Sequence, residues 1–115
     1  MNHYHTQSEP ENVVALCRVA QLSNFLAKQL KGPTRTLAYR IKAEACSYLI
    51  IAGNASLNGI WPGGIVALDL FGDPPARLHI RRSHLRREAR EILDQQTASV
   101  PAVARLGESI NRRKN

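Results

Sequence analysis

The dipeptide Gly32-Pro33 constrains the fold most strongly, because it separates two long segments of helical periodicity. Before it, apolar residues recur at helical spacing behind a capping box at residues 8–11, which predicts a helix over residues 9–31. After it, apolar residues three and four apart predict a second helix over residues 34–52. Because so few residues connect them, the two helices should fold back on each other as an antiparallel hairpin.

Each predicted helix has an apolar stripe that should face the other. The first helix is expected to bury Val13, Leu16, Ala20, Ala27 and Leu30, widened by Cys17, Val19, Phe25 and Leu26. The second is expected to bury Leu37, Ile41, Ala45, Tyr48 and Ala52. Cys17 and Cys46 lie at similar heights in such a hairpin, which would make them neighbours. We expect each to be a small buried hydrophobic residue in a reducing compartment.

The periodicity then changes from helical to alternating. Residues 65–71 and 76–82 alternate apolar and polar side chains on either side of a Gly-Asp-Pro-Pro turn, which predicts a β-hairpin. The outer face of its second strand is wholly basic. The preceding residues 54–64 are rich in Asn, Gly and Pro and have no periodicity, so they are expected to form a loop. Its Trp61 is interpreted as a plug over the edge of the core.

Two more helices are expected after the β-hairpin. Ser83 is positioned to cap a helix over residues 83–96, and Ser99 to cap a last helix over residues 99–110. Residues 1–8 should be a flexible N-terminus and residues 111–115 a basic tail. The predicted class is α+β: one small domain over residues 9–110, built from an N-terminal antiparallel helical hairpin, a β-hairpin and two C-terminal helices.

Positive charge is concentrated toward the C-terminus. The formal net charge is +7, of which residues 1–75 contribute +1 and residues 76–115 contribute +6. The latter segment also holds nine of the twelve arginines. A guanidinium is planar and weakly hydrated, so it suits phosphate oxygens. The charge therefore predicts a small basic nucleic-acid-binding protein, DNA or RNA, with an accessory or regulatory role.

The candidate contact residues lie on the second strand, on the helix after it and in the tail. Alternate side chains share one face of a strand, and residues four apart share one face of a helix. We therefore expect the strand's basic face and the stack of Arg82, Arg86 and Arg90 to form one continuous surface. The candidate nucleic-acid-binding residues are Arg77, His79, Arg81, Arg82, Arg86, Arg87, Arg90, Arg112 and Arg113.

A second interpretation of the same charge is a non-enzymatic interaction module, an inhibitor or adaptor that docks on an acidic protein. Part of the charge should be compensated within the third helix. Arg87 lies four residues before Glu91, a spacing that favours an ion pair, and Arg90 has the same spacing to Asp94. Because aromatic residues are only 5% of the chain and none is interleaved with the arginines, modules that stack single-stranded bases are disfavoured.

No sequence pattern supports catalysis, a metal or a cofactor. There is no HExxH, GxSxG or phosphate-loop glycine motif, and no convergent pair of ionisable groups is indicated. The longest apolar run, residues 48–52, is far shorter than the roughly 20 residues of a membrane-spanning helix. Two cysteines are too few for a disulfide-stapled secreted scaffold. We expect a cytoplasmic protein without membrane contact.

The segment from Arg77 to Arg113 resembles a ribbon-helix-helix module, with a strand bearing outward polar residues, a helix, and a capped second helix opening at Ser99. The resemblance implies a homodimer whose paired strands enter the major groove. It also implies that Arg77, His79 and Arg81 read the bases while Ser99 marks a phosphate contact. The sequence departs from that pattern in placing another strand before this one, which would compete for the edge that dimer pairing needs.

Overall fold

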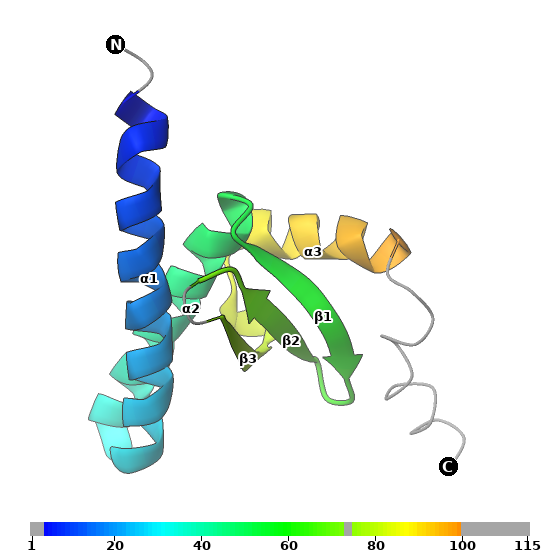
Figure 1. The fold of residues 1–115 in the computed structure, drawn as a ribbon. Coiled ribbons are helices and arrows are strands. Elements are labelled where there is room, and N and C mark those ends of the chain that lie inside the picture. Colours follow the sequence, from blue (N-terminus) through cyan, green and yellow to red (C-terminus); the bar gives the residue numbers. More distant parts are fainter. Residues whose placement is uncertain (1–3, 73–74, 100–115) are drawn as a thin grey trace.

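The chain forms a helical hairpin beside a three-stranded antiparallel sheet (Figure 1), so the expected α+β class is confirmed. The structure is a computed structural model that describes residues 4–72 and 75–99 and, of these, the side chains of 12–72 and 75–97. Within those residues the elements are α1 (Tyr4–Gln29), α2 (Gly32–Ile51), β1 (Ala55–Trp61), β2 (Ile65–Leu70), β3 (Ala76–Arg81), a 3₁₀ turn (Arg82–His84) and α3 (Arg87–Ser99).

Helices α1 and α2 form the predicted hairpin, and the break between them has local causes. Gly32 has a φ of 63°, which other residues adopt only at a cost, and Pro33 lies in the first turn of α2, where its missing N–H is not needed. The Arg35 guanidinium reaches back across the turn. Its Nε donates to the carbonyl oxygens of Ala27 and Leu30, at 2.9 Å each, and so caps the end of α1.

Helix α1 is longer than predicted and buries a narrower stripe. It begins at Tyr4, five residues before the start indicated by the capping box. Ala20 and Ala27 are fully buried as expected, and Cys17 with them. The larger side chains expected to widen the stripe, Val19, Phe25 and Leu26, are exposed.

The buried face of α2 also differs from the predicted one. Leu37, Ile41 and Tyr48 were expected to face inward, but they are 53%, 42% and 53% exposed. The inward face consists mainly of small side chains with one lysine among them: Ala38, Lys42, Ala43, Ala45, Cys46, Ser47, Leu49 and Ile50. Small side chains let two helix backbones approach closely and pack densely, so this face is buried although the neighbouring stripe is more hydrophobic.

The sheet has one strand more than predicted. Residues 54–64, expected to be a loop, contain β1 and its tight turn into β2, where Gly63 and Gly64 have φ values of 83° and 76°. β1 pairs antiparallel with β2, and Asn58 is the extra residue of a bulge in that pairing. The prediction of a loop was wrong because the bulge interrupts the alternation by which a strand is found in a sequence.

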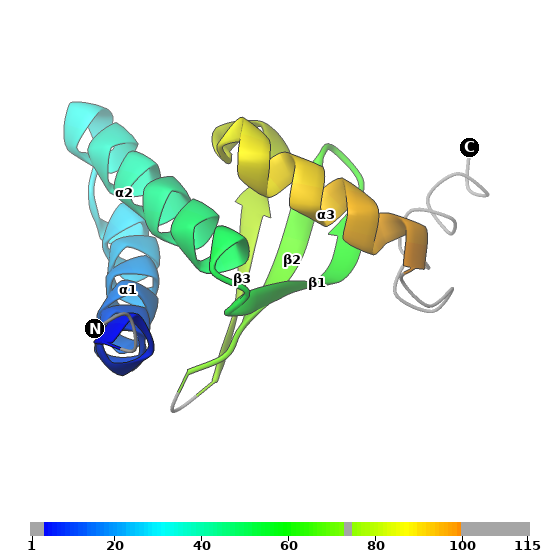
Figure 2. The same cartoon turned by 90° about the horizontal axis from the view of Figure 1, so that it is seen from above.

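The predicted β-hairpin is confirmed as β2 and β3, and the strand order is β1-β2-β3. Directly opposed residues share one face of an antiparallel sheet, so Val66 with Ile80 and Leu68 with Leu78 form the core face. Helix α3 crosses this face (Figure 2). It contributes buried Ala89 and Leu93, and Leu85 joins them from the segment before it.

The third helix begins four residues later than predicted. Residues 82–84 form a 3₁₀ turn, Leu85 is extended with φ −82° and ψ 154°, and α3 starts at Arg87. The extended backbone at Leu85 directs its side chain into the core, where it is 2% exposed. Helix α3 runs to Ser99, which was expected to cap a further helix. The rest of that predicted helix and the basic tail lie outside the described residues.

The two cysteines are free and belong to the core between the helices. Burial raises the pKa of Cys17, and it raises the pKa of Cys46 to about 12, so both thiols stay protonated near neutral pH. Because the thiolate is the reactive form, we expect a thiol reagent to label neither residue in native buffer and both in denaturant. Mass spectrometry of a labelling time course measures this. Rapid native labelling of Cys46 would contradict the packing of α1 on α2.

Candidate functional site

A groove of about 500 Å³ lies between the outer edge of β3 and the helical hairpin. Four of its side chains come from α1 and α2 and most of the others from β3. The lining residues are Asn24, Lys28, Tyr39, Lys42, Ile65, Arg77, Leu78, His79, Ile80, Arg81 and His84. None of these described residues is an aspartate or a glutamate, so we call this site the basic groove.

Lys42 is the central residue of the basic groove. Its side chain leaves the buried face of α2 and is only 4% exposed. The Lys42 Nζ donates to the backbone carbonyl of His79 on β3 at 2.6 Å, and it lies 5.8 Å from the centre of the Tyr39 ring. An ammonium has three donors, so this bond leaves capacity for a further acceptor in the groove.

The electrostatic environment of Lys42 is unfavourable for its charge. Burial lowers the pKa of Lys42, and the nearby positive charge of Lys28 lowers it further, while Cys46 acts in the opposite direction. Among the described residues no carboxylate forms an ion pair with it. A buried ammonium without a counter-charge is costly, so an anion entering the groove would gain by neutralising it.

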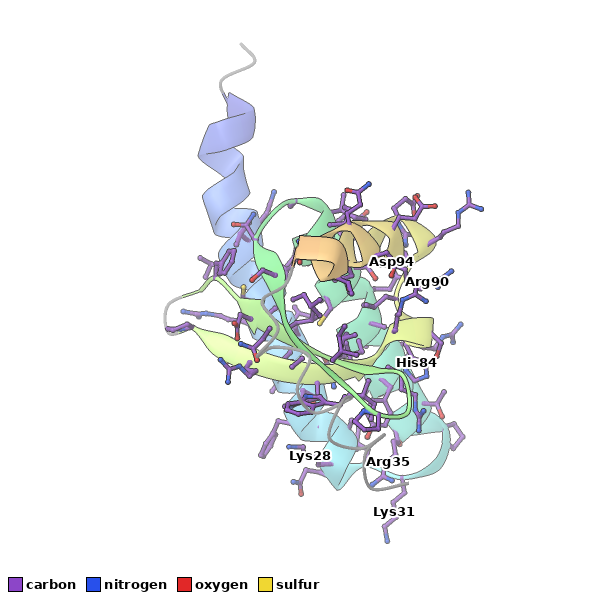
Figure 3. The ribbon with its side chains drawn as sticks, turned by 90° about the vertical axis from the view of Figure 1, so that its right-hand side faces the viewer. Lys28, Lys31, Arg35, His84, Arg90 and Asp94 are labelled. Carbon is purple, nitrogen blue, oxygen red and sulfur yellow. The ribbon has the colours of Figure 1, made fainter. Side chains whose placement is uncertain are left out.

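Lys28 and Arg81 add positive charge to the groove that no described residue compensates. Neither forms an ion pair within the described part of the chain, and both side chains are exposed. Two further cations, Lys31 and Arg35, lie near Lys28 where α1 turns into α2 (Figure 3). Positive charge therefore continues beyond the groove along the turn of the hairpin.

Four arginines predicted as contact residues are instead held in ion pairs. Their partners come from β2, α2 and α3. The pairs are Arg77 with Asp69 at 2.8 Å, Arg82 with Asp94 at 2.7 Å, Arg86 with Glu44 at 3.2 Å and Arg87 with Glu91 at 3.9 Å. Exposed pairs contribute little stability, about 0–1 kcal/mol, but they reduce the local positive field.

The predicted stack of arginines on the third helix is wrong. Arg82 belongs to the 3₁₀ turn and Arg86 precedes the first residue of α3, so only Arg90 of the three lies in that helix. Asp94 binds Arg82 through both of its carboxylate oxygens, rather than Arg90 as its spacing suggested. Arg90 donates to the carbonyl of Leu85 at 2.6 Å. The predicted pair of Arg87 and Glu91 is confirmed.

Of the predicted contact residues, the basic groove contains Arg77, His79 and Arg81. The side chains of Arg82, Arg86, Arg87 and Arg90 lie outside it, and Arg112 and Arg113 fall outside the described residues. Sequence reasoning missed Lys28, Tyr39 and Lys42. The sequence did contain one indication of Lys42. It lies in a row of small residues at helical spacing, where a lysine is unusual because such a row is expected to be buried.

The edge of β3 does not match the ribbon-helix-helix resemblance. One edge of the strand pairs with β2, and the other faces α2, where Lys42 takes the carbonyl of His79. A second copy of the strand would have to displace that bond in order to pair there. Ser99, expected to open a helix at a phosphate, is the last residue of α3.

No family model, curated protein or solved structure matches this chain. Across the residues that the structure describes, no helix has the length and apolarity to span a bilayer. In the same residues, no three His, Cys, Asp or Glu side chains gather as a metal site would require. A function must therefore be inferred from the basic groove and its surroundings.

Lys42 leads to a prediction about stability. A buried unpaired ammonium costs several kcal/mol, whereas the His79 carbonyl without its donor would cost about 1–3 kcal/mol. We therefore expect Lys42→Met, which keeps the apolar stem, to raise the melting temperature at neutral pH. Thermal melts followed by circular dichroism measure the change. A lower melting temperature would mean that the ammonium stabilises the fold.

The same variant tests the direction of the pKa shift. In the folded state the pKa of Lys42 is below its ordinary value of 10.5. At pH values between this lowered pKa and 10.5, the unfolded chain therefore binds more protons than the folded protein. The stability of the parent should therefore rise with pH in that window, and this rise should be missing in Lys42→Met. Melts from neutral pH to about 10.5 compare the two proteins. Parallel curves would contradict a lowered pKa.

Proposed function

We propose that this chain is a small basic protein that binds nucleic acid through its phosphate backbone, in an accessory or regulatory role and without catalysis. The basic groove supports this proposal. Lys28, Lys42 and Arg81 converge on it without a carboxylate among its lining residues, so its chemistry favours an anion. Arg81 supplies a planar fork for phosphate oxygens, and the lysines supply compact point charges.

An extended polyanion suits this surface better than a single small anion. The positive charge continues from the groove to Lys31 and Arg35 at the hairpin turn (Figure 3). Outside the groove, the ion-paired Arg82, Arg86 and Arg87 add basic character with weaker charge. We retain Arg112 and Arg113 as proposed additional contacts. A cytoplasmic location is also proposed, since it would keep Cys17 and Cys46 reduced.

The test is the binding of labelled nucleic acid by a double variant of the groove. Lys28→Gln together with Arg81→Gln should weaken binding of random-sequence DNA at about 50 mM salt. Each lost phosphate contact should also flatten the dependence of log affinity on log salt by roughly one unit. Fluorescence anisotropy measures both quantities. The melting temperature should change little because both side chains are exposed.

A matched control removes two positive charges elsewhere. Arg18 and Arg40 are exposed and lie outside the groove, so Arg18→Gln with Arg40→Gln makes the same change in net charge. We expect this control to lose much less affinity than the groove variant. Equal losses would mean that only net charge matters, and no binding by the parent at micromolar concentration would rule out the proposal.

A second candidate function, an interaction module for an acidic protein, has one specific observation in its favour. Large apolar side chains are exposed along the outer faces of α1 and α2, among them Leu22, Phe25, Leu37, Ile41 and Tyr48. Exposed apolar surface beside basic residues is typical of a protein-binding face. This candidate takes precedence if the parent fails to bind DNA and RNA but co-purifies from its host with an acidic protein that Leu22→Ser with Phe25→Ser no longer retains.

A further inference from the structure

The face of the sheet opposite α3 has an ordered arrangement of aromatic, small and basic residues. The pairing of the three strands places residues in rows across this face. One row is Trp61, Ile65 and Arg81, and the next is Gly59, Ala67 and His79. A tryptophan at one edge of the sheet is thereby placed diagonally opposite a histidine at the other edge.

Trp61 and His79 form an aromatic pair on this face. Their ring centres are 6.1 Å apart and their planes are inclined by 31°. Gly59 and Ala67 lie in the same row as His79, and neither has a side chain large enough to separate the two rings. Trp61 is nevertheless 40% exposed. The pair therefore offers an aromatic surface that solvent, and a flat ligand, can reach.

Arginines flank this aromatic pair on the same strand. Arg77 and Arg81 lie two residues before and after His79, so all three share the outer face. Arg77 is oriented by Asp69, whose other carboxylate oxygen accepts from the Asn58 amide at 3.1 Å. Arg81 has no ion-pair partner among the described residues.

The aromatic pair and the basic groove are continuous. His79 belongs to both, and Arg81, which flanks the pair, also lines the groove, because the groove is lined by residues of the outer face of β3 as well as by α1 and α2. A ligand whose phosphates lie in the groove would therefore have its attached ring systems next to Trp61. A protein carboxylate or a bare phosphate has no ring to place against the Trp61–His79 pair.

We propose that the outer face of the sheet binds single-stranded nucleic acid, stacking an unpaired base on the Trp61–His79 pair while the adjoining phosphates occupy the basic groove. This inference rests on the proposed function and names its substrate class, and it departs from the expectation, drawn from the low aromatic content, that base-stacking modules are disfavoured. A duplex keeps its bases stacked on each other, whereas a single strand can present a base to an aromatic surface. The basic groove favours an anion and the exposed Trp61 favours an unpaired base, and a single strand of nucleic acid has both.

Intrinsic fluorescence provides a direct test, because Trp61 is the only tryptophan in the chain. The parent protein is titrated with three probes at equal phosphate concentration: single-stranded oligothymidylate, a mixed-sequence duplex, and inorganic polyphosphate. We expect the single strand to quench the tryptophan emission strongly. Polyphosphate, which has no bases, should bind without comparable quenching.

Variants test the same contact by anisotropy. Trp61→Ala should lower the affinity for labelled oligothymidylate by about 5- to 150-fold, the usual effect of removing a base-stacking residue, and leave duplex affinity nearly unchanged. Trp61→Phe keeps a ring and should retain most of the affinity. Phe71→Ala is the matched control, since Phe71 is a similarly exposed ring, 53% exposed, just beyond the end of β2.

The outcomes separate this inference from the function on which it rests. If all three probes bind but none quenches Trp61, or if Trp61→Ala binds oligothymidylate like the parent, base stacking is overturned and the groove remains an anion site. If the parent binds no probe, the proposed function fails as well. Should Trp61→Ala prove unfolded by circular dichroism, the quenching titration of the parent still decides.

Discussion

The bond from the Lys42 ammonium to the His79 carbonyl fixes the position of the helical hairpin against the sheet, although burying the ammonium costs stability. It joins residues 37 positions apart and ties the helical hairpin to the outer edge of the sheet. If the hairpin moved away, a carbonyl and a buried charge would both lose their partner, which is unfavourable away from water. The same bond engages the open edge of β3, where a strand of another molecule could otherwise pair. One side chain thus connects two layers, restricts an edge and supplies charge to the groove.

The close approach of α1 and α2 explains why the molecule has two different surfaces. Small residues such as Ala20, Ala27 and Cys46 occupy the helix interface and are fully or almost fully buried. With the interface filled by small side chains, the larger apolar residues of both helices point outward. The outer side of the hairpin is therefore apolar, while the side toward β3 is basic. The two surfaces lie on different sides of the same helices, so a partner bound to one would leave the other accessible.

The sequence predicted features set by local chemistry and missed those set by tertiary packing. Gly32-Pro33 located the hairpin turn, and alternation located β2 and β3 with the correct core faces, because backbone preference and residue period act locally. The buried face of α2 was misassigned because hydrophobicity does not reveal how closely two helices approach. At the site, Arg77, His79 and Arg81 were found from the strand pattern. Lys28 and Lys42 were not, since they reach the groove from another layer, and Arg82 found a partner that its spacing did not indicate.

The bulge at Asn58 determines which side of the sheet Trp61 occupies. Side chains alternate along a strand, so the extra residue reverses the orientation of everything that follows it in β1. If the same residues paired without the bulge, Asn58 would lie opposite Ala67, so Ile60 would turn to the outer face and Trp61 toward the core beside α3. Strict alternation along β1 would therefore place the aromatic residue in the core, and the extra residue at position 58 places it at the surface. In this sheet, the character of an entire face depends on one bulge as much as on the composition of the strand.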